Sequence, residues 1–231
     1  MISQVHTLEV YRGNLYAGTW PEGKMVRCEA DNRWADCGNV GIDTVSQKIN
    51  EINDLTVYNG KLYSGVIPKG EIWRYEGGKQ WTRVKQLVQN PDWSTTNLFS
   101  WNRVPCMTVF QGRLFAGTST CHGRAEARPK TDAGKVFSWE AGKSVSYDDD
   151  IGTGWNHLVA VKAGHQLKLF LNGKLAGTSS SFDASRFQLS NDKPLLIGFG
   201  ARNYFAGFMK DLRIYNRALG RSEVKLLRRK G

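Results

Sequence analysis

The chain has 231 residues, of which 40% are hydrophobic and 11% aromatic, enough for one large core or two smaller ones without a metal or a disulfide. Lys and Arg together number 32 against 21 Asp and Glu, and the resulting net charge of +11 favours attraction to anionic surfaces. The longest apolar runs have the length of strands rather than the roughly 20 residues of a membrane-spanning helix, which excludes a membrane-embedded protein of the helical type.

The first residues, 1–5, carry neither the basic start nor the apolar segment of a signal peptide. We therefore expect either a cytoplasmic protein or a chain that begins inside a longer exported one. The four cysteines are too few for a disulfide framework and lack the paired short spacing of zinc ligands. Two states are compatible with the sequence, buried free thiols or additional disulfides, for Cys28, Cys37, Cys106 and Cys121.

One segment recurs three times, at residues 8–18, 55–65 and 107–117, with a period of about 50 residues. Each copy alternates apolar residues, passes through a two-residue turn and ends at a glycine. Asn59-Gly60 is the clearest of these turns, because Asn and Gly tolerate the positive φ angles of a tight hairpin. Each copy therefore predicts a β-hairpin.

A second hairpin follows the first in each repeat and is clearest at residues 71–75 and 80–84. The corresponding strand pairs in the other repeats are 24–28 with 33–37 and 135–139 with 144–147. Four short antiparallel strands per repeat are typical of a β-propeller blade. Residues 58–65 and 72–78 resemble the kelch-like propeller repeats of bacterial surface proteins.

We assign three such repeats, at about 5–38, 52–85 and 104–147, to a first part that covers residues 1–147. Closed propellers use about four to eight blades, so three would leave strand edges unpaired. The missing blades are expected upstream, in a second copy of the chain, or in the part that follows. Self-association through unpaired strand edges is the resulting prediction.

The second part, 148–231, has a different pattern of strands followed by a short helix. The predicted strands are 155–162, 166–171, 174–177, 194–199 and 207–215. Ser222 is predicted to cap the helix, whose apolar side would carry Val224, Leu226 and Leu227.

Four phrases in this part, at 154–161, 169–174, 194–198 and 205–219, are similar to the second half of laminin-G-like, concanavalin-type domains. The resemblance implies a jelly roll that binds carbohydrates, sulfated glycans or proteins, often with calcium and usually without catalysis. A jelly roll needs about eight strands and only about five are visible here. The blade strands or another chain would have to complete it.

Asp148, Asp149 and Asp150 offer the oxygen ligands that calcium prefers and are the candidate metal site. The competing interpretation is an acidic, solvated linker. Three tryptophans near predicted turns or in long connections could stack on a sugar ring, although packing roles are the alternative for each. These are Trp20, Trp93 and Trp101.

Cations crowd the C-terminal end, where Arg221, Lys225 and Arg228 share one helix face and Arg217 precedes them. Guanidinium groups can donate two parallel hydrogen bonds to sulfate or carboxylate, so these four residues form a candidate site for an acidic or sulfated glycan. The alternative is a solvated face whose charge complements the helix dipole.

The combined prediction is an all-β, non-catalytic recognition or adhesion module that binds glycans or protein surfaces and is extracellular or periplasmic. The alternative is a fragment of a carbohydrate-active, sialidase-like hydrolase, but the sequence brings no set of catalytic residues together. Nucleic acid is the least favoured partner, since charge is its only supporting feature.

Overall fold

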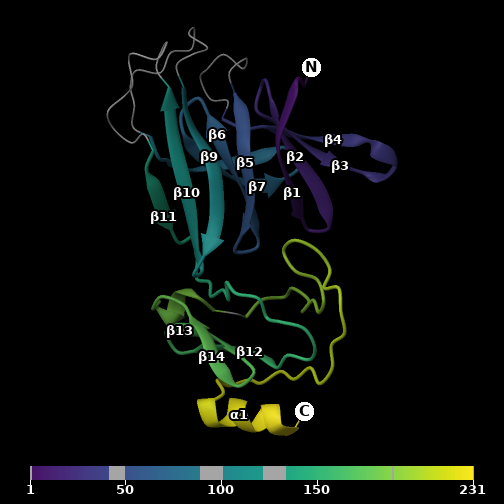
Figure 1. Ribbon diagram of the computed structural model, residues 1–231, viewed down its shortest axis with the longest axis vertical. Helices are drawn as coiled ribbons and strands as arrows, with labels where there is room; N and C mark the ends of the chain where they lie inside the picture. Colours follow the sequence, from purple (N-terminus) through teal and green to yellow (C-terminus); the bar gives the residue numbers. More distant parts are fainter. Residues whose placement is uncertain (1, 42–49, 89–100, 122–133, 189, 231) are drawn as a thin grey trace. The chain divides into compact units, whose positions relative to one another are not determined.

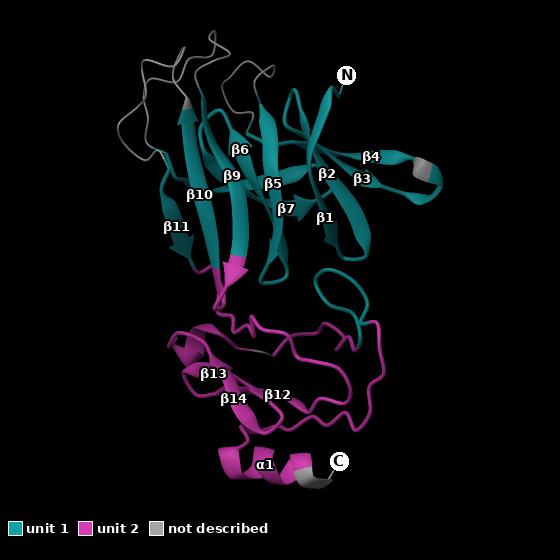
Figure 2. Ribbon diagram, in the orientation of Figure 1, with its two compact units in different colours: residues 1–108, 114–139, 198–205 teal, residues 109–113, 140–197, 206–231 magenta. Residues whose placement is uncertain are grey.

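The computed structural model describes residues 2–41, 50–88, 101–121, 134–188 and 190–230. They form fourteen strands in four antiparallel sheets and one α-helix, which confirms the all-β fold class (Figure 1). The chain divides into two compact units that interleave in the sequence (Figure 2). Unit 1 comprises residues 1–108, 114–139 and 198–205, and unit 2 comprises residues 109–113, 140–197 and 206–231.

Unit 1 contains three of the sheets, and within each the strands follow one another in chain order. The first sheet consists of β1 (Gln4–Tyr11), β2 (Asn14–Trp20), β3 (Lys24–Cys28) and β4 (Trp34–Asn39). The second consists of β5 (Glu51–Tyr58), β6 (Lys61–Ile67), β7 (Glu71–Gly77) and β8 (Gln80–Gln86). The third consists of β9 (Trp101–Phe110), β10 (Arg113–Cys121) and β11 (Val136–Trp139).

The predicted hairpin turns are confirmed in all three repeats. Gly13, Gly60 and Gly112 have φ angles of 74°, 75° and 71°, and the residue before each also has a positive φ. Two consecutive positive φ angles match the right-handed twist of the flanking strands, which is why Gly is used at the second position.

The fourth strand predicted for the third repeat, at 144–147, does not form. Instead, the Ser146 hydroxyl accepts a hydrogen bond from the Gly112 N–H at 2.8 Å, and the Asp148 carboxylate accepts one from the Gln111 N–H at 2.8 Å. This segment therefore contacts the β9–β10 turn through its side chains and does not pair with β11.

The second sheet packs against the first through a continuous apolar core. The side chain of Ile52 on β5 lies directly over Gly18 on β2, where an added Cβ would come within 2.2 Å of Ile52 Cγ2. Val104 on β9 lies in the same way over Gly65 on β6, where an added Cβ would be 2.4 Å from the Val104 carbonyl oxygen. Glycine is required at both places because the next sheet occupies the space of a side chain.

Unit 2 contains one three-stranded sheet and the helix. Its strands are β12 (Leu158–Ala163), β13 (Gln166–Leu171) and β14 (Lys174–Thr178), and the helix is α1 (Arg221–Lys230). The strands predicted at 166–171 and 174–177 are confirmed, and the one predicted from residue 155 begins at Leu158.

The strands predicted at 194–199 and 207–215 are not formed. A strand is stabilised by hydrogen bonds to a neighbour, and the only bridge in this region of the described chain joins Phe199 to Tyr204. Apolar side chains of both segments, such as Leu195, Phe208 and Ile214, are consequently exposed. The described part of unit 2 is thus an incomplete sandwich.

Cys28, Cys37 and Cys106 are free thiols, whereas the side chain of Cys121 lies outside the described residues. Among the helices of the described residues, none is long and apolar enough to cross a membrane.

Candidate functional site

Helix α1 is fixed to the sheet of unit 2 by its apolar side. Val224 is fully buried and packs with Val161 of β12 and Phe170 of β13. Leu227 is half-buried, but Leu226 is exposed, so the predicted apolar side of the helix is correct for two of its three residues. The polar face of α1 is therefore held in one orientation on the sheet.

The start of α1 is held by Glu223 rather than by the predicted cap Ser222, which lies inside the helix. The Glu223 carboxylate accepts a hydrogen bond from the Gly220 N–H at 2.8 Å, which is one half of a capping box. Arg217 donates two further hydrogen bonds to the same carboxylate, at 2.5 and 3.0 Å. Arg217 is thus paired within the protein and is not a free cation for a ligand.

The Arg217 guanidinium, together with the Gly220 N–H, lowers the pKa of Glu223 to about 2. Replacing Arg217 with glutamine is expected to raise this pKa toward the ordinary value of a glutamate, which an NMR titration of the Glu223 side chain measures. Because the folded-state pKa is depressed, the pairing stabilises α1 above the unfolded-state pKa and is lost as the pH falls toward 2. An unchanged midpoint in Arg217→Gln would show that the ion pair does not form in solution.

The other three predicted cations lie on α1 and are exposed. One N–H of Arg228 donates to the Asn172 carbonyl oxygen at 2.9 Å, and its Cδ lies over Gly173, so the side chain is anchored on the β13–β14 turn. Arg221 and Lys225 have no ion-pair partner among the residues that the structure describes. We call Arg221, Lys225 and Arg228 the basic face of α1.

The helix dipole accounts for only part of this face. A cation in the last turn, such as Arg228, is stabilised by the partial negative charge of the helix C-terminus. Arg221 is the first residue of α1, where the partial charge is positive and a cation is unfavourable. The alternative interpretation, in which the cations only complement the helix dipole, therefore does not explain the position of Arg221.

The two predicted tryptophans that the structure describes lie on different sheets. Trp20 ends β2 and is half-buried, while Trp101 begins β9 with the Arg103 guanidinium 4.6 Å from the centre of its ring. These two strands belong to the first and third sheets of unit 1. Trp93 lies outside the described residues.

Trp155, the first residue of the strand predicted at 155–162, does not lie inside a strand. It precedes β12 and is 62% exposed, with the Lys210 ammonium 5.1 Å from the centre of its ring. An exposed indole beside a cation is a surface on which a sugar ring can stack. The glycines at 152 and 154 just before it were the local sequence signal for a turn at this place.

The three aspartates of the candidate calcium site are exposed and partly engaged in local turns. Asp148 accepts hydrogen bonds from the Gln111 N–H and the Ser146 hydroxyl, and Asp150 accepts one from the Gly152 N–H. In the described ranges, no three His, Cys, Asp or Glu side chains come close enough together to hold a metal ion.

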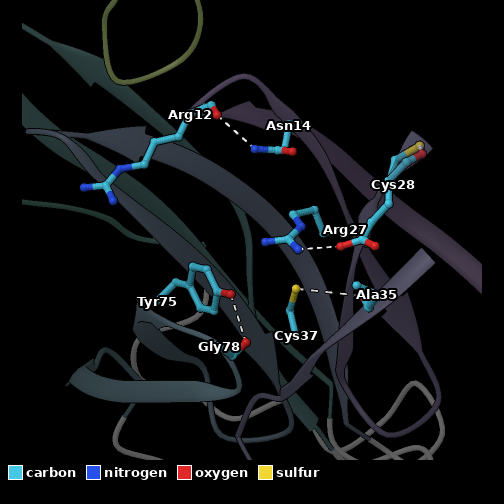
Figure 3. Close-up of polar contacts among 9 residues, drawn as sticks. Arg12, Asn14, Arg27, Cys28, Ala35, Cys37, Tyr75 and Gly78 are labelled. Atoms are coloured by element: carbon cyan, nitrogen blue, oxygen red, sulfur yellow. Dashed lines mark hydrogen bonds and ion pairs between the residues drawn. The ribbon is translucent and has the colours of Figure 1, made fainter. Parts of the chain in front are cut away.

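A cluster of tyrosine, arginine and cysteine in unit 1 was not anticipated from the sequence (Figure 3). Arg27 donates to Glu29 at 2.5 Å, and the Tyr75 hydroxyl donates to the Gly78 carbonyl oxygen at 2.9 Å. Burial raises the pKa of the Cys37 thiol and of the Tyr75 phenol, so both stay protonated near neutral pH. These groups are poorly suited to act as nucleophiles.

The aromatic rings of this cluster belong to the core between the first two sheets. Tyr11, Tyr16, Tyr75 and Trp81 follow one another with ring centres 5.9, 5.9 and 5.0 Å apart. The three tyrosines are almost fully buried. They stabilise the packing of the sheets and leave no ring face for a ligand.

Comparison with known proteins identifies one family. A family model described as the concanavalin A-like lectin/glucanases superfamily, of the laminin-G type, matches residues 78–225. Among solved structures, an S-layer domain-containing protein from Clostridium thermocellum is similar over 71% of this chain and 87% of that one, at 15% identity and a TM-score of 0.29. No curated protein matches the sequence.

Proposed function

The chain belongs to the concanavalin A-like lectin/glucanases superfamily, and on this premise we propose that it is a non-catalytic module that recognises glycans or protein surfaces. The observation that carries the proposal is the basic face of α1. Its three cations are exposed on a helix that Val224 fixes to the sheet, so their backbone positions are set before any ligand arrives. Such preorganisation reduces the entropy that binding would otherwise cost.

The chemistry of the basic face favours an acidic or sulfated glycan. Arg221 and Arg228 can each donate two parallel hydrogen bonds to a sulfate or carboxylate, and Lys225 adds a compact charge between them. Arg217 was part of the same candidate site but is engaged with Glu223, so the proposed ligand contacts exclude it. Trp155 is a second contact for a sugar ring on the same unit.

A carbohydrate-active hydrolase is the competing function, because the superfamily description includes glucanases. The two functions are separated by incubating the purified chain with chromogenic glycosides and sialosides while measuring its binding to immobilised neutral, sialylated and sulfated glycans. The proposal expects binding to the acidic glycans without turnover. Turnover that survives repurification and disappears with a single carboxylate substitution would instead establish an enzyme.

Two further expectations accompany this function. A glycan- or surface-binding module of this superfamily suits an extracellular or periplasmic location. Calcium binding at Asp148, Asp149 and Asp150 stays a prediction, and a rise in melting temperature at millimolar calcium is the measurement that bears on it.

A further inference from the structure

The same packing contact joins the first sheet of unit 1 to the second and the second sheet to the third. The first and third sheets each carry one half of this contact on their other face. Aligning the repeats on Leu8, Leu55 and Met107 makes Val5, Ile52 and Val104 equivalent, and likewise Gly18, Gly65 and Gly117. Ile52 lies on Gly18 and Val104 lies on Gly65. The branched residue of the second and third sheets therefore fills the space above the glycine of the sheet before it.

A polar contact repeats in the same register. The Thr7 hydroxyl of the first sheet accepts a hydrogen bond from the Leu55 N–H of the second at 3.2 Å. At the equivalent place, the Asp54 carboxylate of the second sheet accepts one from the Met107 N–H of the third at 2.5 Å. Two independent contacts thus define the same sheet-to-sheet interface.

Among the residues that the structure describes, the first sheet presents the entering side of this interface without a partner. Val5 and Leu8 are 58% and 59% exposed, whereas their equivalents in the second sheet, Ile52 and Leu55, are 0% and 3% exposed. Both buried residues contribute to the core between sheets. The exposed pair therefore has the chemistry and spacing of residues that are buried when a preceding sheet is present.

The third sheet presents the receiving side. Gly117 is equivalent to the two covered glycines, but within the described chain a Cβ placed on it would meet only Cys106 of its own sheet. Cys106 and Thr108 are exposed, while Thr56, the equivalent of Thr108, is buried under the third sheet and bonded to the Met107 carbonyl oxygen. The two open faces are thus the two complementary halves of an interface that the chain already forms twice.

We infer that a second copy of this chain docks head to tail, with Val5 and Leu8 of one copy on Gly117, Cys106 and Thr108 of the other. Continuity with the two internal interfaces identifies the occupant as a sheet of the same repeat, and a second copy supplies it. The contact is heterologous, because each copy uses a different face on its two sides, and such contacts close into a ring when the rotation permits. Two copies contribute six sheets, within the range of about four to eight blades in closed propellers.

Multi-angle light scattering tests this assembly with one variant for each face. The wild type is expected to have twice the 25.9 kDa mass of one chain. Val5→Asp/Leu8→Asp blocks the entering face, Cys106→Arg/Thr108→Arg blocks the receiving face, and each variant alone is expected to be monomeric. Lys85→Asp is the matched control, because Lys85 is exposed on the outer strand β8 of the second sheet, which supplies neither of the two open faces.

Mixing the two blocked variants decides the orientation. Each retains the face that the other lacks, so the mixture is expected to form a two-chain complex through a single interface. Circular dichroism and melting curves establish that each variant is folded. A wild type that stays monomeric up to its solubility limit, a Lys85→Asp variant that loses the dimer equally, or folded blocked variants that fail to combine would each overturn the inference.

Discussion

Gly65→Ala is expected to lower the free energy of unfolding by about 3 kcal/mol, at the upper end of the range for overpacking a core. The added methyl group would lie 2.4 Å from the Val104 carbonyl oxygen and 2.9 Å from Val104 Cβ, so the strand β9 would have to move away from the second sheet. The Val104 carbonyl oxygen belongs to the backbone, so it cannot move out of the way by a change of rotamer as a side chain can. For a chain of this size, the expected fall in melting temperature is roughly 6 to 12 °C.

Gly117→Ala is the matched control for this prediction, with both alanine substitutions made in the Val5→Asp/Leu8→Asp variant so that no second copy covers Gly117. It makes the same substitution at the equivalent strand position, but of the described residues its Cβ would meet only Cys106, whose sulfur can change rotamer. The expected loss in unfolding free energy is below about 1 kcal/mol. Equal losses in the two variants would show that the tight approach of neighbouring sheets at Gly65 does not exist.

Asp54→Ala is expected to destabilise the chain by about 1 to 3 kcal/mol, because it leaves the Met107 N–H without its acceptor at the interface of the second and third sheets. Thr56 would also lose the Asp54 carboxylate as a partner. Asp54→Asn retains a side-chain oxygen that can accept from Met107 and is expected to lose less. Chemical unfolding of the two variants and the wild type measures the difference.

The difference in stability between the wild type and Asp54→Asn is expected to depend on pH. Burial raises the pKa of Asp54, against the lowering effect of the hydrogen bond from the Met107 N–H. A raised folded-state pKa means that the contribution of Asp54 is fully present below its unfolded-state pKa and is lost as the pH rises through the folded-state value. The stability of the wild type relative to Asp54→Asn should therefore increase as the pH falls toward 4. A difference that is independent of pH would contradict the burial of this carboxylate.

Local signals in the sequence predicted the hairpins of both units well. A turn such as Asn59-Gly60 requires positive φ angles that few residues adopt, so its position is visible in the sequence without knowledge of the rest of the fold. The cap of α1 is also visible locally, because Glu223 stands three residues after Gly220, the spacing of a capping box, whereas the predicted cap Ser222 lies inside the helix.

Features that depend on distant partners could not be predicted in this way. Residues 194–199 and 207–215 have strand-like composition, yet a strand also needs an available neighbour, and the described chain pairs only Phe199 with Tyr204 there. The role of Asp148 depends on the backbone of Gln111, which lies far away in the sequence. The engagement of Arg217 with Glu223 likewise removed one residue from a site that the charge pattern alone had assigned to a ligand.

The assignment of the basic face to glycan binding is tested most directly by comparing elution from heparin with elution from a simple sulfonate cation exchanger. The wild type is expected to leave heparin at a clearly higher salt concentration, because a defined site adds hydrogen bonds to the screened attraction of its net charge. Arg221→Gln/Lys225→Gln/Arg228→Gln should remove this difference. The control Arg186→Gln/Lys193→Gln/Arg213→Gln, which neutralises the same numbers of exposed Arg and Lys residues on unit 2, should lower elution from both resins and keep the difference. Equal elution of the wild type from the two resins, or equal effects of the two triple variants, would contradict a glycan site on α1.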